Sequence, residues 1–303
     1  NGNHFNAEKV NFYYGITSLQ PLGMGNNSIA PCYSCYWNVE SKFRRYNRIK
    51  ELFGGKETIA AILLLPQDIN VKTIPKIQTL IINIETQMHS EDYLVTSIDW
   101  LLTQWEYIRK DEKSIPKDYT DSIIGGLRRL GYGIAPNYEI DKKRFNFGDM
   151  CVIYRNMEQR SVKLTAEYCT SELFIKLASY IVHADKITHS DIEFVERQLQ
   201  SYHNTSGNYR HLTAVARWKF LSKKQPIDRR TQNAIATLTS MQRKTMGNAL
   251  IRLACINGNV LQKRIDCLKK VLPLLGIESE NIHSQIHRLL TDREGFAVVE
   301  KKS

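Results

Sequence analysis

The chain has 303 residues, of which 42% are hydrophobic, so it can bury a substantial core in one to three domains. The longest uncharged apolar run, residues 58–66, is about half of the ~18 residues that a membrane span requires, so none is expected. Lysine and arginine exceed aspartate and glutamate by 42 − 31 = 11, which favours an anionic partner. Six scattered cysteines do not form a disulfide framework, and we expect a reduced, cytoplasmic protein.

The N-terminal region divides into an arm and the start of a helical domain. Residues 1–40 are rich in Asn, Gly, Tyr and Pro, which is typical of an irregular arm. Residues 41–54 predict a helix that begins at the N-cap Ser41 and ends at Gly54. Residues 57–65 fit a helix or a buried strand equally, because periodicity does not decide for so short a run.

The predicted N-terminal helical domain covers residues 41–156. Apolar residues at helical spacing predict one helix from Thr73 to Met88 and another over residues 94–108. Pro116 prevents the second helix from continuing, and Asp118 is a candidate N-cap for a third helix that ends at Gly131. Residues 131–133 predict a turn, and the alternating stretch 149–154 is the best strand candidate.

From about residue 158 nearly the whole chain predicts helix. Candidate helix starts are Thr170, Thr188, Asp228 and Ser240, and candidate breaks are Gly207, Pro226 and Gly276. Residues 293–303 form a charged tail. Helical spacing assigns the following residues to the core: Leu173, Leu177, Ile181, Val195, Leu199, Trp218, Leu221, Leu238, Leu250, Leu253, Leu268, Leu272 and Leu275.

Residues 173–199 and 247–276 have the same organisation, and each contains an apolar helix, a short polar turn and an amphipathic helix. Their alignment places Asp185 opposite Asn257, Asp191 opposite Arg264, and Glu193 opposite Asp266. An internal repeat is a strong fold signal. We therefore predict an all-α protein in which residues 157–292 form a helical bundle of two related helical hairpins.

The turn of the first repeat carries a family resemblance. Residues 184–187 (Ala-Asp-Lys-Ile) and 256–260 (Ile-Asn-Gly-Asn-Val) occupy the place of the Ala-Asp-Gly turn of the bacterial TerB family, named for tellurite resistance. Residues 212–226 and 271–290 resemble its middle helix and closing stretch, and residues 127–137 resemble the segment that precedes TerB in its longer members. The resemblance implies an all-helical domain without a catalytic reaction. It also implies a place in stress-response and anti-phage gene clusters, beside ATPases and helicases.

The same resemblance implies a divalent cation, calcium or magnesium, held by carboxylates. Asp185, Asp191 and Glu193 are the candidate ligands, because hard cations prefer several oxygen donors. In the second repeat Arg264 cannot ligate a metal, and it is a candidate partner for Asp185 or Asp191 instead. The alternative is purely structural: Asp185 caps the turn, and Asp191 supports the N-terminus of the next helix.

A basic run is the strongest binding candidate, and its members are Lys42, Arg44, Arg45, Arg48 and Lys50. Such residues neutralise phosphates, and the nearby aromatic residues Tyr36 and Trp37 suit stacking on bases. The same run also suits an acidic protein surface or a solvated helix face. A second basic cluster is predicted to be simple surface, and it contains Lys219, Lys223, Lys224, Arg229 and Arg230.

The remaining motifs are weak. Cys32 and Cys35 have the spacing of half a zinc site without a second pair, and the histidines form no ligand motif. The sequence therefore predicts a non-enzymatic interaction scaffold in a bacterial stress-response or antiviral defence assembly, beside an ATPase, helicase or nuclease and with a protein partner. Two alternatives stay open, a nucleic-acid-binding subunit and a divalent-metal-sensing module.

Overall fold

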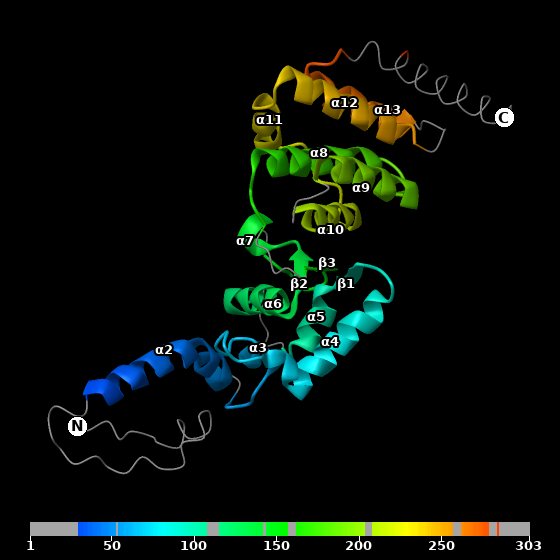
Figure 1. Ribbon diagram of the computed structural model, residues 1–303. Coiled ribbons are helices and arrows are strands. Elements are labelled where there is room, and N and C mark those ends of the chain that lie inside the picture. The colour runs from blue at the N-terminus through cyan, green and yellow to red at the C-terminus, as the bar shows by residue number, and fades with distance from the viewer. Residues whose placement is uncertain are drawn as a thin grey trace, which may run out of the picture.

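The computed structural model describes residues 30–52, 54–107, 115–141, 144–156, 162–203, 208–256, 262–278 and 284. Within these ranges the chain is mostly helical, with one small sheet between an N-terminal lobe and a helical bundle (Figure 1). Helices are thus confirmed as the dominant element of the predicted all-α fold, and a small sheet accompanies them. None of the helices in this part of the chain combines the length and apolar character needed to cross a bilayer.

The N-terminal lobe contains the helices α2 (Ala30–Leu52), α3 (Ile59–Ile62), α4 (Pro75–Met88), α5 (Ile98–Gln104), α6 (Lys117–Leu130) and α7 (Tyr138–Asp141). The irregular arm was wrong for residues 30–40, because α2 begins at Ala30, and residues 1–29 lie outside the described ranges. The undecided stretch 57–65 contains the short helix α3, where the Thr58 hydroxyl accepts from the backbone N–H of Ala61.

The sheet is the part of the fold that was predicted least well from the sequence. β1 (Tyr93–Ser97), β2 (Tyr132–Ala135) and β3 (Met150–Arg155) form an antiparallel sheet in the order β1-β3-β2. The strand predicted at 149–154 is confirmed. The helix predicted over 94–108 was wrong in its first part, since α5 begins only at Ile98, after the N-cap Ser97. The turn predicted at 131–133 was wrong too, because Tyr132 and Gly133 pair with β3.

Both faces of the central strand β3 are buried, each in a different hydrophobic core. On β3, Cys151 and Ile153 pack into the core of the N-terminal lobe, while Val152 and Tyr154 pack into the core of the bundle. This alternation follows from the two-residue period of a strand. Helix α10 (Asn208–Leu221) packs over the bundle-facing side of the sheet (Figure 1).

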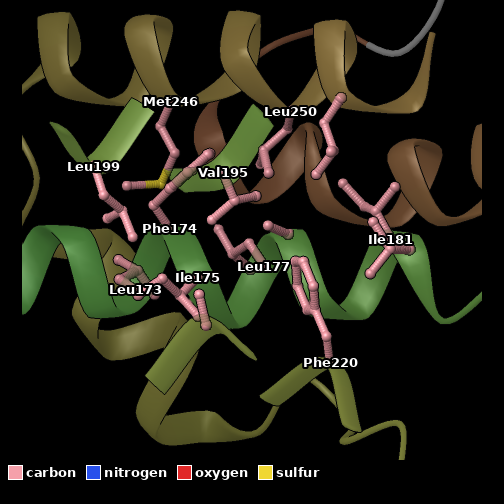
Figure 2. Close-up of a cluster of buried hydrophobic side chains, with 14 of the residues drawn as sticks. Leu173, Phe174, Ile175, Leu177, Ile181, Val195, Leu199, Phe220, Met246 and Leu250 are labelled. Carbon is pink, nitrogen blue, oxygen red and sulfur yellow. The ribbon is translucent and has the colours of Figure 1, made fainter. Parts of the chain in front are cut away.

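The other helices of the bundle are α8 (Ala166–Val182), α9 (His189–His203), α11 (Arg229–Ala236), α12 (Ser240–Ala254) and α13 (Gln262–Val271). Thr170 was wrong as a helix start, because the N-cap of α8 is Thr165. Asp228 is confirmed as the N-cap of α11. Every predicted core residue is buried except Leu221, which is 47% exposed at the end of α10. Figure 2 shows part of this core, with Leu177, Val195 and Leu250 pointing toward one another.

A histidine is buried where α10 meets the sheet. The Tyr154 ring lies across Gly133 of the paired strand, where an added Cβ would overlap it. This position brings the Tyr154 hydroxyl to 3.0 Å from Nδ1 of His211. The Nε2 atom of His211 is buried without a hydrogen-bond partner, and burial lowers the pKa of His211 to about 4.

This histidine makes the fold sensitive to acid. The folded-state pKa lies below the unfolded value of about 6.5, so its contribution to stability is complete above pH 6.5 and is lost as the pH falls toward 4. We expect the free energy of unfolding to drop by about 2 kcal/mol between pH 7 and pH 5. Urea titrations at a series of pH values measure this slope. A His211→Gln variant with the same slope as the wild type would contradict the assignment.

Candidate functional site

Asp191, one of the three candidate metal ligands, stabilises the start of α9. Its Oδ2 atom accepts hydrogen bonds from the backbone N–H and the hydroxyl of Thr188, both at 2.9 Å. In return, the backbone N–H of Asp191 donates to the Thr188 hydroxyl at 3.4 Å. This reciprocal arrangement has the logic of a capping box, and it agrees with the structural alternative for Asp191.

Arg264 occupies the other side of the Asp191 carboxylate. Its Nη1 and Nη2 atoms lie 2.7 and 2.9 Å from Oδ1 and Oδ2 of Asp191, and both side chains are buried. Burial alone raises the pKa of Asp191, but the hydrogen bonds from Arg264 and Thr188 outweigh it, and the pKa stays below its ordinary value. The pairing of Arg264 that the sequence allowed with Asp185 or Asp191 is therefore confirmed for Asp191.

The other two candidate ligands do not join Asp191. Asp185 is exposed, and Glu193 is exposed with its carboxylate 3.1 Å from His189. Among the residues with described positions, no group of three His, Cys, Asp or Glu side chains is placed to hold a metal. Because a guanidinium already satisfies both Asp191 oxygens, these residues do not fit a cation site, and we derive no metal chemistry from them.

The Asp191–Arg264 contact also bears on the predicted repeat. The alignment of the two hairpins makes these residues equivalent, and in the structure they lie against each other at the starts of α9 and α13. Equivalent positions meet in this way when two related hairpins pack around a twofold axis. The duplication stays a prediction, and this contact supports it.

The basic run lies on α2, where its cations alternate with apolar residues that are buried. Phe43, Tyr46 and Ile49 are buried against the lobe, and the Tyr46 hydroxyl donates to Glu57 at 2.8 Å. The exposed cations of the same stretch, which are Lys42, Arg44, Arg45 and Arg48, make up the α2 basic face. Arg44 and Arg48 lie one turn apart on the side of the helix away from the lobe, whereas Lys42 lies one turn before Tyr46. Lys50 is half-buried with its ammonium 5.6 Å from the Tyr46 ring centroid. The side chains of Tyr36, Trp37, Cys32 and Cys35 lie outside the described residues.

A cleft next to this face was missed by the sequence analysis. It has a volume of about 1230 Å³ and lies between residues 63–72 and one side of α6. The lining residues used below are Arg45 of α2, Lys72 of the loop, Lys117, Asp121 and Gly125 of α6, and Tyr138 of α7. They are distant in sequence, so no local pattern could reveal the cleft.

Arg129 holds the loop wall of the cleft in place. Its guanidinium donates to the carbonyl oxygen of Leu63 at 3.1 Å and to those of Pro66 and Ile69 at 2.7 Å, and it also donates to Leu65. Burial lowers the pKa of Arg129. Because these carbonyls follow α3, Arg129 supplies a donor to acceptors at the end of the short helix and in its loop, where the Pro66 carbonyl also accepts from the N–H of Ile69.

The charges around the cleft are unevenly paired. Arg128 forms an ion pair with Glu139, and the Lys117 ammonium lies 5.9 Å from the Tyr138 ring centroid. Arg45 and Lys72 are exposed and form no ion pair within the described part of the chain. The rim of the cleft therefore offers positive charge that the fold itself does not use.

Other arginines form ion pairs where the two lobes meet. Arg155 of β3 lies 2.5 Å from Glu85 and 3.3 Å from Asp92. Arg217 of α10 is paired with Glu196 at 2.6 Å, and its nearest distance to Glu91 is 3.6 Å. These cations hold the turn between α4 and β1 against the bundle. Exposed positive charge lies on α2 and the cleft rim, and also on the bundle, where the exposed cations include Lys223, Lys224, Arg229, Arg230, Lys269 and Lys270.

Comparisons of the chain with family models, with curated proteins and with solved structures find no match in any of the three. The TerB resemblance thus stays a prediction from the sequence.

Proposed function

We propose that this protein is a non-enzymatic scaffold that binds an acidic face of a partner protein through the α2 basic face. Its setting, on the TerB resemblance, is a bacterial stress-response or anti-phage assembly that includes an ATPase, helicase or nuclease. The observation that carries the proposal is the two-sided character of α2. Phe43, Tyr46 and Ile49 fix the helix to the lobe, and Lys42, Arg44, Arg45 and Arg48 of the same stretch are exposed to solvent. A helix anchored in this way presents its charges at fixed positions, which favours specific docking.

The experiment is a purification of the tagged protein from its native host, after treatment with nuclease. We expect a stoichiometric protein partner to copurify with the wild type. Lys42→Glu combined with Arg44→Glu should remove that partner, because like charges across an interface cost several kcal/mol. Neither side chain contributes to the core, so the melting temperature of the variant should match that of the wild type.

Arg229→Glu combined with Arg230→Glu is the matched control, since it makes the same charge change on exposed residues of α11. This control should keep the partner. A wild-type protein that elutes alone, or a partner that both variants lose equally, would contradict the proposal.

A divalent-metal sensor is disfavoured as an alternative function, because Arg264 takes both oxygens of Asp191. The nucleic-acid alternative has a specific observation in its favour, which is the cationic cleft beside α2.

A further inference from the structure

We propose that the cleft between α6 and residues 63–72 is a binding site for single-stranded nucleic acid. This site shares Arg45 with the α2 basic face, but the inference does not depend on the protein-binding role of α2. Three features of the cleft support the inference: a glycine in its floor that the fold does not require, a wall in which internal hydrogen bonds already occupy several main-chain groups, and a rim of cations beside an aromatic ring.

Gly125 is the first feature. It lies in the middle of α6, faces the cleft and is exposed. A Cβ added at Gly125 would meet no atom within 4 Å, whereas one added at the neighbouring Gly126 would lie 2.6 Å from Cδ1 of Leu63. Packing thus explains Gly126 but not Gly125, although glycine within a helix is unfavourable. A glycine that the fold does not need is suited to the close approach of a ligand.

The loop wall is poorly suited to one common way of binding a peptide. The carbonyls of Leu63, Leu65, Pro66 and Ile69 all accept hydrogen bonds from Arg129. The backbone N–H groups of Leu64, Leu65 and Ile69 donate to carbonyls within the loop and α3. An extended peptide that adds to a sheet edge needs such main-chain groups. This wall therefore favours a ligand that is held by side-chain charge and by stacking.

The rim supplies both of these. Arg45, Lys72 and Lys117 come from three different elements and surround the cleft, while the half-buried Tyr138 ring lies next to the Lys117 ammonium. A cationic groove with an aromatic ring is the usual arrangement for a single strand, because the phosphates meet the cations and a base stacks on the ring. The α2 basic face continues from Arg45, so positive charge extends beyond the cleft. The carboxylates of Asp68 and Asp121 also line the cleft and keep phosphates away from their own parts of it.

The experiment measures fluorescence anisotropy of a labelled single-stranded 20-nucleotide oligothymidylate, titrated with the full chain at several salt concentrations. We expect saturable binding at low salt that weakens as salt rises. Lys72→Ala combined with Lys117→Ala should weaken binding at least tenfold. The slope of log K against log salt is negative, and the variant should make it less steep by about 1.4, because each phosphate contact on a single strand contributes about 0.7.

Gly125→Gln is the most direct variant, because it fills the floor without changing charge. It should weaken binding at least tenfold while leaving the melting temperature unchanged or higher. Gly125→Ala, which adds only one carbon, should give an intermediate affinity and covers the case in which glutamine disturbs the helix. Arg229→Ala combined with Arg230→Ala removes two cations of α11, which does not line the cleft, and this variant should bind within about twofold of the wild type.

Four results would overturn the inference. They are no binding at low salt, equal affinity for a duplex of the same length, displacement by polyglutamate as effective as by unlabelled oligonucleotide, and unchanged affinity in both Gly125 variants. None of them bears on the proposed protein partner of α2, which is tested by Lys42→Glu with Arg44→Glu.

Discussion

Replacing Arg264 by methionine is expected to lower the free energy of unfolding by about 3–5 kcal/mol, because it leaves the Asp191 carboxylate buried without its charge partner. The methionine fills much of the volume, so most of the loss is electrostatic. Chemical denaturation followed by circular dichroism at pH 7 measures the effect.

The informative control is the double variant with Arg264→Met and Asp191→Asn. Asparagine removes the buried charge but retains an oxygen that accepts from the N–H of Thr188. The double variant should therefore be more stable than Arg264→Met alone. A double variant that is less stable would show that the charge of Asp191 is not what Arg264 compensates.

The melting temperature of the wild type should not respond to calcium, magnesium or a chelator, because Arg264 occupies the carboxylate.

Arg129→Ala is expected to cost at least about 3 kcal/mol, since hydrogen bonds to a charged group contribute roughly 1.5–3 kcal/mol each and Arg129 donates to four carbonyls. The preceding residue provides a matched control. Arg128 forms a partly exposed ion pair with Glu139, so Arg128→Ala should cost less than about 1 kcal/mol. Urea denaturation of the two variants compares them directly. Equal losses would contradict the role assigned to Arg129.

The helices that the sequence predicted well are those whose apolar residues keep a single face over several turns. Ile77, Leu80, Ile84 and Met88 are buried along α4, and the bundle helices follow the same rule. The Asp191–Arg264 contact was also within reach of the sequence, because aligning the hairpins placed a cation where a carboxylate was expected.

The sheet could be predicted only in part from the sequence, for a physical reason. Leu94, Ile98 and Leu101 have helical spacing, yet Leu94 lies on β1 while the others lie on α5. Their common burial comes from two elements that meet at Ser97. β2 was hidden for a different reason, because its Gly133 suggested a turn, whereas this glycine makes room for the Tyr154 ring.

The cleft could not be predicted because it is formed by polar residues of α6 that carry no periodic signal and by a loop more than 40 residues earlier in the chain. The role of Arg129 depends on the path of that loop, and the sequence does not give this path. The α2 basic face, in contrast, follows from the helix period once residues 41–52 are helical.

The burial of both faces of β3 has a consequence for how the protein can be divided. The domain boundary predicted between residues 156 and 157 falls directly after a strand that contributes Ile153 to one core and Val152 to the other. A cut at that point would remove the sheet against which the bundle packs, and it would expose Val152 and Tyr154 of the separated N-terminal fragment to water. We therefore expect the two lobes to unfold as one cooperative unit.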